Sequence, residues 1–193
     1  MFLKRVFDIV SSFIGLILIM PVLLIASVLI RIKMSKPVFF KHERIGRFGI
    51  PFTMYKFRTM VNDHHNGSIS VLGEKRITKL GAVLRKYKID ELPELWNILK
   101  GDMSFVGPRP DVKEYCDRLE GEEKLILNLR PGLTGLASLK YKNEEQLLSR
   151  VKDPVAYNND VIWPDKVKIN LDYYHHTTFL KDIRIILRTF LSF

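Results

Sequence analysis

Residues 9–30 read IVSSFIGLILIMPVLLIASVLI, an apolar run without charge in which serines are the only polar side chains. A helix needs about 20 apolar residues to cross the hydrocarbon core of a bilayer. A cleaved signal peptide has a shorter apolar region followed by a small-residue cleavage site, whereas this run continues into RIKMSK at residues 31–36. The N-terminus therefore predicts a membrane helix rather than a cleaved leader.

Basic residues flank this run on both sides: Lys4, Arg5, Arg31, Lys33, Lys36 and Lys41. The positive-inside rule places both flanks on the cytoplasmic face, which a straight spanning helix cannot satisfy. A re-entrant helix that breaks at Pro21 can satisfy it, because proline removes an N–H and clashes with the preceding turn. On these residues alone, a single span with a proline kink remains the alternative.

The composition of the chain favours an anionic partner. Its 193 residues carry 31 Lys and Arg against 21 Asp and Glu, a net charge of +10. Such a balance suits nucleic acid, an anionic membrane or a phosphorylated substrate. The apolar run and the lack of a recognisable nucleic-acid-binding motif disfavour nucleic acid. The single cysteine, Cys116, excludes an internal disulfide and a cysteine-based zinc site.

We expect two parts in the chain: a membrane helix hairpin over residues 1–36 and a cytosolic, membrane-associated domain over 37–193. Residues 37–60 contain short β-like runs broken by glycine and proline, which predict a hairpin. Helices are expected over 77–89, from about Asp90 to Lys100, and through much of 111–129, with RPGLTG at 130–135 as a turn-rich connection. Residues 141–165 predict a short helix plus loop. The predicted class is α+β, mainly α.

The C-terminal segment FLKDIRIILRTFLSF, residues 179–193, predicts an amphipathic helix. Its apolar stripe is formed by Leu180, Ile183, Leu187 and Phe190. Three basic residues lie largely off that stripe: Lys181, Arg184 and Arg188. Such a helix either lies in a membrane interface or packs against the core, and the N-terminal membrane helix favours the interface.

Two adjacent carboxylates, Asp90 and Glu91, stand in the stretch KIDELPELWNILKGDMSFVGPRP, residues 88–110. The simplest interpretation is a helix cap at Asp90, with Pro93 in the first turn. A helix start would keep Asp90 ionised and would also attract phosphate. The second interpretation is therefore a phosphate-handling centre, in which one carboxylate attacks phosphorus while the other holds Mg²⁺ or moves a proton.

Two arginines near this pair strengthen the second interpretation. Arg85 lies five positions before Asp90, and Arg109 stands between Pro108 and Pro110. Proline on both sides restricts the backbone, so the guanidinium of Arg109 is held on a stiff support suited to bidentate phosphate contacts.

The chain resembles the bacterial sugar transferase family, in its short, monotopic form of polyprenol-phosphate phosphoglycosyl transferase. The matching stretches cover almost the whole sequence: KRVFDI with the proline-containing apolar run, ERIGRFGIPFTMYKFRTM, ITKLGAVLRKYKIDELPELWNILKGDMSFVGPRP, RPGLTG and LDYYHHTTFLKDIRIILRT. The resemblance implies transfer of a sugar-1-phosphate from a UDP-sugar to undecaprenyl phosphate, with release of UMP and a need for Mg²⁺. It also implies contact with membrane lipids at the cytosolic face of the bacterial inner membrane, in exopolysaccharide or lipopolysaccharide synthesis.

The resemblance also implies roles for individual residues. Asp90 would attack the β-phosphorus and carry the phosphosugar, and Glu91 would bind Mg²⁺ with Asp90 or assist the acceptor. The residues that match basic family positions, and so would bind substrate phosphate, are Arg85, Lys56, Arg58 and Arg109. Each of these cations could instead pair structurally with a carboxylate.

One segment departs from the family pattern. After PGLTG, many relatives continue with a tryptophan and a Gln-Val-Asn-Gly-Arg stretch, whereas residues 136–146 here read LASLKYKNEEQ. The identity of the sugar is therefore not inferred. The pairs His64-His65 and His175-His176 are expected to have no metal or catalytic role. A non-catalytic membrane-anchored module remains the competing function, and the oligomeric state is open, a homodimer included.

Overall fold

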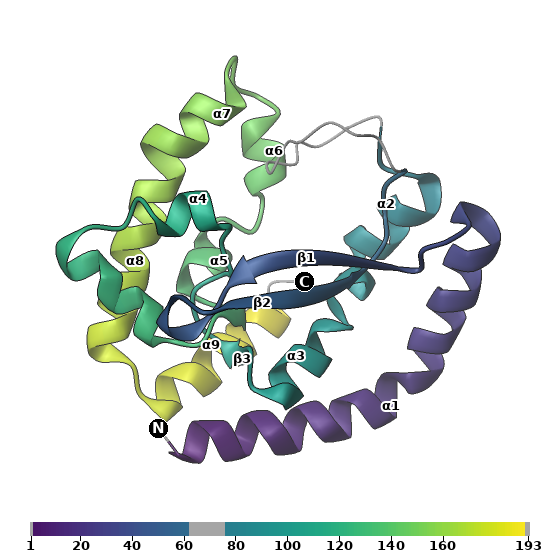
Figure 1. Ribbon diagram of the computed structural model, residues 1–193, viewed down its shortest axis with the longest axis horizontal. Helices are drawn as coiled ribbons and strands as arrows, with labels where there is room; N and C mark the ends of the chain where they lie inside the picture. The colour runs from purple at the N-terminus through teal and green to yellow at the C-terminus, as the bar shows by residue number, and fades with distance from the viewer. Residues whose placement is uncertain (1, 62–75, 192–193) are drawn as a thin grey trace.

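The structure is a computed structural model that describes residues 2–61 and 76–191 (Figure 1). It is mostly helical with a small antiparallel hairpin, as the sequence predicts. The elements are α1 (Phe2–Met34), β1 (Phe39–Ile45), β2 (Pro51–Phe57), α2 (Lys79–Lys86), α3 (Glu94–Lys100), β3 (Ser104–Val106), α4 (Lys113–Cys116), β4 (Gly132–Thr134), α5 (Leu136–Lys140), α6 (Glu144–Leu148), α7 (Pro154–Tyr157), α8 (Trp163–His176) and α9 (Phe179–Leu191).

The N-terminal helix α1 continues through Pro21 without interruption. The predicted break is therefore not confirmed. Figure 1 shows that α1 instead curves along one side of the molecule. The nearby serines bond within their own helix: Ser12 Oγ donates to the carbonyl of Asp8 at 2.6 Å, and Ser27 Oγ to that of Leu23 at 2.7 Å. A proline removes one helical hydrogen bond, and a long helix absorbs that loss as curvature.

One face of α1 packs along the domain over most of its length. Leu16 and Ile19 join a core cluster built on Met54, Leu95, Ile98 and Met103. Further along, Ala26 and Ile30 pack with Phe57 and Leu84. The opposite face is apolar and open, with Phe13 55% and Leu18 73% exposed. Among the described helices, α1 is the one long and apolar enough to cross a membrane.

The beginning of α1 is tied to the domain by its two basic residues. Lys4 Nζ donates to the carbonyl of Val106 at 2.7 Å and to Asp182 Oδ2 at 2.6 Å. The guanidinium of Arg5 donates to the carbonyls that end α3, at 2.7 Å and 2.8 Å. Such charge-assisted bonds are stronger than neutral ones, so they hold this end firmly.

The other end of α1 is tied to the same domain by Arg58. Its guanidinium donates to the carbonyls of Ser35 at 2.9 Å, Lys36 at 3.1 Å and Met34. The last carbonyls of a helix have no partner within it, and a cation stabilises that end. Arg58 is only 7% exposed, which fits this structural position.

The predicted hairpin is confirmed as β1 and β2, which pair antiparallel from Phe39↔Phe57 to Ile45↔Pro51. The side chain of Asn97 on α3 fixes β2, because its Nδ2 donates to the carbonyl of Thr53 at 2.7 Å and its Oδ1 accepts from the amide of Tyr55 at 3.2 Å. Asn97 is fully buried, so these bonds also satisfy its polar atoms. The hairpin therefore brings Lys56 beside α3.

The RPGLTG segment is not only a turn, because Gly132–Thr134 forms β4 and pairs parallel with β3. Two glycines permit this close approach. A Cβ on Gly132 would lie 2.1 Å from the amide nitrogen of Gly107, and one on Gly107 would lie 2.3 Å from the carbonyl oxygen of Arg130. The glycines that suggested a turn are thus the residues that let two backbones touch.

The structures predicted for two other segments are confirmed only in part. Residues 111–129 form the short α4 and a 3-10 helix over Gly121–Asn128, whose first residue, Gly121, has φ 52°. Residues 141–165 contain α6, α7, a π turn over Asn158–Ile162 and the start of α8.

The predicted C-terminal helix is confirmed as α9, but Leu180 and Phe190 on its apolar stripe are 70% and 73% exposed. The face of α9 that packs on the core carries Asp182 and Ile185 instead.

Candidate active site

The Asp90-Glu91 pair lies in a separate turn between α2 and α3. Thr78 caps the start of α2, because its Oγ1 accepts from the amide of Gly81 at 2.9 Å. After α2 the backbone of Lys88 adopts a left-handed conformation with φ 55°, and Ile89–Glu91 forms a single 3-10 turn. Helix α3 starts only after Pro93. The prediction that Asp90 caps this helix is therefore wrong, because Asp90 lies within a 3-10 turn of its own and Pro93 is the residue that precedes α3.

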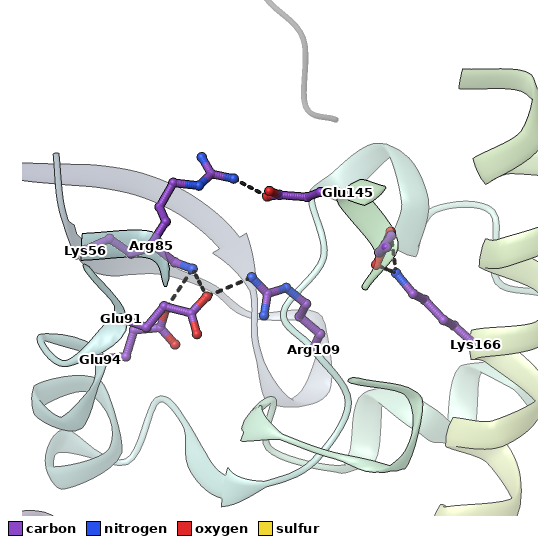
Figure 2. Close-up of polar contacts among 8 residues, drawn as sticks. Lys56, Arg85, Glu91, Glu94, Arg109, Glu145 and Lys166 are labelled. Atoms are coloured by element: carbon purple, nitrogen blue, oxygen red, sulfur yellow. Dashed lines mark hydrogen bonds and ion pairs between the residues drawn. The ribbon is translucent and has the colours of Figure 1, made fainter. Parts of the chain in front are cut away.

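Lys56 and Arg109 converge on the carboxylates of this turn (Figure 2). Lys56 Nζ lies 2.9 Å from Glu91 Oε1 and 3.0 Å from Glu94 Oε1. Arg109 Nη2 donates to the same Glu91 oxygen at 3.1 Å. Pro108 and Pro110 on either side of Arg109 are buried, while its own side chain is 49% exposed. The turn thus holds two cations that come from β2 and from the segment after β3.

The two glutamates of this network respond differently to their surroundings. Burial opposes ionisation of Glu91, but the charges of Arg109 and Lys56 hold the pKa of its carboxyl well below the usual range. Burial raises the pKa of Glu94, and the neighbouring Glu91 charge adds to that rise against the effect of Lys56. Glu91 is therefore the firmly ionised member of the pair.

One oxygen of the Asp90 carboxylate is left without a hydrogen-bond partner in the described parts of the chain. Its Oδ1 is buried and accepts no hydrogen bond within residues 2–61 and 76–191. Burial, followed by the adjacent Glu91 charge, raises the pKa of Asp90 above its ordinary value. We expected the start of a helix to keep Asp90 ionised, but Asp90 is not at a helix start. The interactions that favour its ionised form are instead the positive charges of Lys56, Lys88 and Arg85. A poorly solvated, unpartnered carboxylate is suited to act as a nucleophile.

Arg85 reaches out from the end of α2 to the carboxylate of Glu145 on α6, as Figure 2 shows. Glu145 belongs to residues 136–146, the segment that departs from the family pattern. The neighbouring Glu144 pairs with Lys166 at 2.7 Å. This segment therefore borders the same group of charges as the Asp90-Glu91 turn.

The structure brings together most, but not all, of the sequence-predicted site residues. Asp90, Glu91, Lys56 and Arg109 meet at the turn, and the charge of Arg85 acts on Asp90. Arg58 does not join them, because its guanidinium is bound at the end of α1. Its predicted phosphate-binding role has no support from this position. His64-His65 lie outside the described residues.

Sequence reasoning missed Glu94 and Glu145. Glu94 is 3% exposed, and it lies four residues after Asp90 and three after Glu91, the spacing that places side chains on one side of a helix. That spacing is the feature of the sequence that could have identified Glu94 as a neighbour of the pair. Nothing in the local sequence indicates that Glu145 pairs with Arg85, which lies 60 positions earlier in the chain.

The oxygen donors of the turn fit a magnesium ion. Among the described residues there is no group of three or more His, Cys, Asp or Glu side chains placed to enclose a metal. Mg²⁺ does not require such a cage, since it commonly uses one or two carboxylates, several waters and substrate phosphate oxygens. Asp90 offers an oxygen with no partner, so the residues present are compatible with this ion.

The chain is similar in sequence to several known proteins. The family model described as "Bacterial sugar transferase" matches residues 1–193. The uncharacterized sugar transferase EpsL of Bacillus subtilis is 34% identical over 98% of this chain and 86% of its own length. A UDP-N-acetylgalactosamine-undecaprenyl-phosphate N-acetylgalactosaminephosphotransferase of Aeromonas hydrophila is 33% identical over 97% of this chain, but over only 43% of its own length. A UDP-glucose:undecaprenyl-phosphate glucose-1-phosphate transferase of Caulobacter vibrioides is 33% identical over 96% of this chain and 67% of its own.

Proposed function

Because the chain belongs to the bacterial sugar transferase family, we propose that it transfers a sugar-1-phosphate from a UDP-sugar to undecaprenyl phosphate. The observation that carries the proposal is the buried, unpartnered Oδ1 of Asp90 beside a turn that holds Lys56 and Arg109. A diphosphate substrate needs such cations, and a displacement at phosphorus needs such a nucleophile.

The reaction divides into two displacements at one phosphorus atom. In the first, a carboxylate oxygen of Asp90 forms a bond to the β-phosphorus, and the bond from that phosphorus to the bridging oxygen breaks. UMP leaves with that oxygen, and the phosphosugar remains on Asp90 as an acyl phosphate. In the second, an oxygen of undecaprenyl phosphate attacks the same phosphorus, which releases the Asp90 carboxylate and yields a polyprenyl diphosphosugar.

The cations of the turn stabilise the negative charge that both displacements share. Arg109 is the most accessible of them and stands on a stiff support, so it is placed to contact phosphate oxygens. Lys56 stays between Glu91 and Glu94 and keeps Glu91 ionised. Arg85 would exchange Glu145 for a phosphate oxygen when substrate binds.

Asp90 and Glu91 are the residues that would hold Mg²⁺. When bound, the ion would neutralise diphosphate charge and so reduce its repulsion from these carboxylates. Glu91 fits this task better than Glu94, because its pKa is lowered while that of Glu94 is raised.

The sugar is not defined by family membership. The named relatives include enzymes for N-acetylgalactosamine, for glucose and, in Salmonella typhimurium, for galactose. Residues 136–146 supply Glu145, the partner of Arg85, so this segment is positioned to influence which sugar is accepted.

Incubation of the purified full-length chain with Mg²⁺, undecaprenyl phosphate and a panel of UDP-sugars is expected to release UMP with at least one sugar. Chromatographic detection of UMP and of the lipid-linked sugar checks both products. Omission of undecaprenyl phosphate should leave at most one UMP per protein, because the phosphosugar then stays on Asp90. A broad panel without any UMP would contradict the proposed reaction and favour a non-catalytic membrane module.

We also propose that α1 enters and leaves the membrane on the cytosolic face. Lys4 and Arg5 tie its beginning to the domain, and Arg58 ties its end to the same domain. A helix that crosses the bilayer would carry its two ends to opposite sides. The curve of α1 and its exposed apolar face instead suit a helix embedded in one leaflet.

Single cysteines at the start of α1 and on β1, beyond the end of α1, test this topology. Phe2→Cys and Glu43→Cys, each in a Cys116→Ser background, are both expected to resist a membrane-impermeant thiol reagent added to intact cells. Both should react once the inner membrane is opened, which serves as the matched control. Labelling of one end alone in intact cells would establish a spanning helix.

A further inference from the structure

A groove of about 420 Å³ lies where α9 meets the start of α5. Three of its lining side chains are basic, namely Lys181, Arg184 and Arg188. The others are Leu136, Thr178, Leu180 and Ile185. This volume falls within the range of about 300–1,000 Å³ that is usual for small-molecule sites. The groove shares no residue with the Asp90-Glu91 turn.

Most of the positive charge that lines this groove is not paired with a carboxylate in the described residues. Arg184 and Arg188 are exposed, and neither forms a hydrogen bond or ion pair with any part of the chain that the structure describes. Lys181 Nζ is 3.8 Å from the carboxylate of Asp172, the limit of an ion pair. Near Asp90, in contrast, Lys56, Arg85 and Arg109 each pair with a carboxylate. The groove is therefore a place where an anion would find unpaired cations.

The basic residues form one flank of α9. At 100° per residue, Lys181, Arg184 and Arg188 fall within about 60° of one another around the helix. The outward face beside them is apolar, with Leu180 70% and Leu187 56% exposed, while the inward face carries buried Ile185. An apolar outward face next to a basic flank is typical of a helix that lies at the level of lipid headgroups.

Contacts with α1 place this flank near the membrane element. Lys4 Nζ pairs with Asp182 Oδ2 on α9 at 2.6 Å. The rings of Phe7 on α1 and Phe179 on α9 meet edge to face with centroids 5.7 Å apart. Since α9 is fixed to the beginning of α1, an embedded α1 would bring the outward face of α9 to the lipid surface.

We propose that this groove binds the headgroup of an anionic phospholipid of the phosphatidylglycerol type, at a site separate from that of the undecaprenyl phosphate substrate. The inference rests on the membrane placement proposed above. The single negative phosphodiester would face Arg184 and Arg188, and the acyl chains would lie beside Leu180 and Leu187. Phosphatidylcholine is a poor occupant, because its trimethylammonium group would be repelled by three cations.

Lipid binding by the full-length chain tests the proposal. Native mass spectrometry of the detergent-purified protein is used with phosphatidylglycerol, phosphatidylcholine and undecaprenyl phosphate as separate probes. The variant Arg184→Gln/Arg188→Gln is expected to bind phosphatidylglycerol about 10- to 30-fold more weakly, since each basic residue near an anionic lipid surface contributes about fivefold. The matched control Arg150→Gln/Lys152→Gln removes the same charge from exposed positions and should bind as the wild type.

Other results of the same binding experiment would overturn the proposed site or its proposed occupant. Equal binding of phosphatidylglycerol by the variant and the wild type would overturn the site. Selective loss of undecaprenyl phosphate binding would assign the groove to the substrate and overturn the proposed occupant. UMP release in micelles without phosphatidylglycerol is expected to be unchanged in the variant. Lipid binding is measured without turnover, so the two proposals are tested independently. A protein that releases no UMP would contradict the proposed reaction but would not affect the conclusion about lipid binding.

Discussion

Asp90→Asn is expected to reduce sugar-phosphate transfer by roughly 10³-fold or more, the scale seen when a nucleophile is removed. The amide has nearly the same shape as the carboxylate but cannot form the acyl phosphate. Oδ1 of Asp90 accepts no hydrogen bond in the described parts of the chain, so the substitution removes no structural contact of that atom. The loss should appear in kcat, measured as UMP release with the best UDP-sugar of the panel.

The same variant is expected to be at least as stable as the wild type. The pKa of Asp90 is raised in the folded protein by burial and by Glu91, so the folded state favours the protonated form. At neutral pH the ionised carboxylate therefore destabilises the fold, and asparagine removes that charge. The destabilisation disappears as the pH falls below about 4, where the carboxyl is also protonated in the unfolded chain. Thermal midpoints of the two proteins should accordingly converge on acidification.

Asp165→Asn is the matched control for this pair of measurements. Asp165 is a partly exposed carboxylate that pairs with Lys140 at 2.6 Å, far in sequence from the turn. We expect near-wild-type turnover and at most a small change in thermal midpoint. Retention of wild-type turnover by Asp90→Asn would reject Asp90 as the nucleophile. A large drop in its thermal midpoint would instead show that the side chain has a structural role.

Lys56→Met is expected to lower stability by about 3–5 kcal/mol, the usual effect of removing one partner from a buried ion pair. Lys56 is the ammonium between Glu91 and Glu94, whose side chains are 14% and 4% exposed. Without it, Glu94 has no remaining ion-pair partner in the described structure, and Glu91 retains only Arg109. For a chain of this length the thermal midpoint should fall by about 10 °C.

A second substitution separates this electrostatic effect from lost packing. Lys56→Met/Glu94→Gln removes the charge left unpaired and is expected to recover part of the midpoint. Lys140→Met, which breaks the more exposed pair with Asp165, should shift the midpoint by no more than about 2–4 °C. Scanning calorimetry at one fixed heating rate compares all four proteins. If Lys56→Met melts with the wild type, the ion pairs of the turn contribute little to the fold.

Local sequence patterns predicted the helices and strands that surround the site. Glycine and proline between β-like runs indicated the hairpin, and the helix expected from about Asp90 to Lys100 corresponds to α3, which ends at Gly101 with φ 103°. These features depend on residues a few positions apart, so the sequence is sufficient to predict them. The adjacent carboxylates and the proline-bounded Arg109 could likewise be found by inspection.

The partners of the charged residues could not be found in this way. Arg58 and Lys56 stand two positions apart on one hairpin, yet one binds the end of α1 and the other the Asp90-Glu91 turn. Successive positions of a strand point to opposite sides, but where the chain leaves the strand that alternation no longer applies. Arg58 lies just beyond β2, so its direction follows from the docking of α1 rather than from a local pattern.

The sequence by itself determined the long apolar N-terminal helix, the hairpin, the adjacent carboxylates and the family, because each depends on a local pattern or a motif. Only the tertiary structure decided that α1 bends without breaking, that both its ends bind one domain, and that Asp90 Oδ1 is buried without a hydrogen-bond partner among the described residues. It also added Glu94 and Glu145 to the charges around that turn. The physical reason is that burial and ion pairing depend on which distant segments pack together, and local periodicity does not specify those contacts.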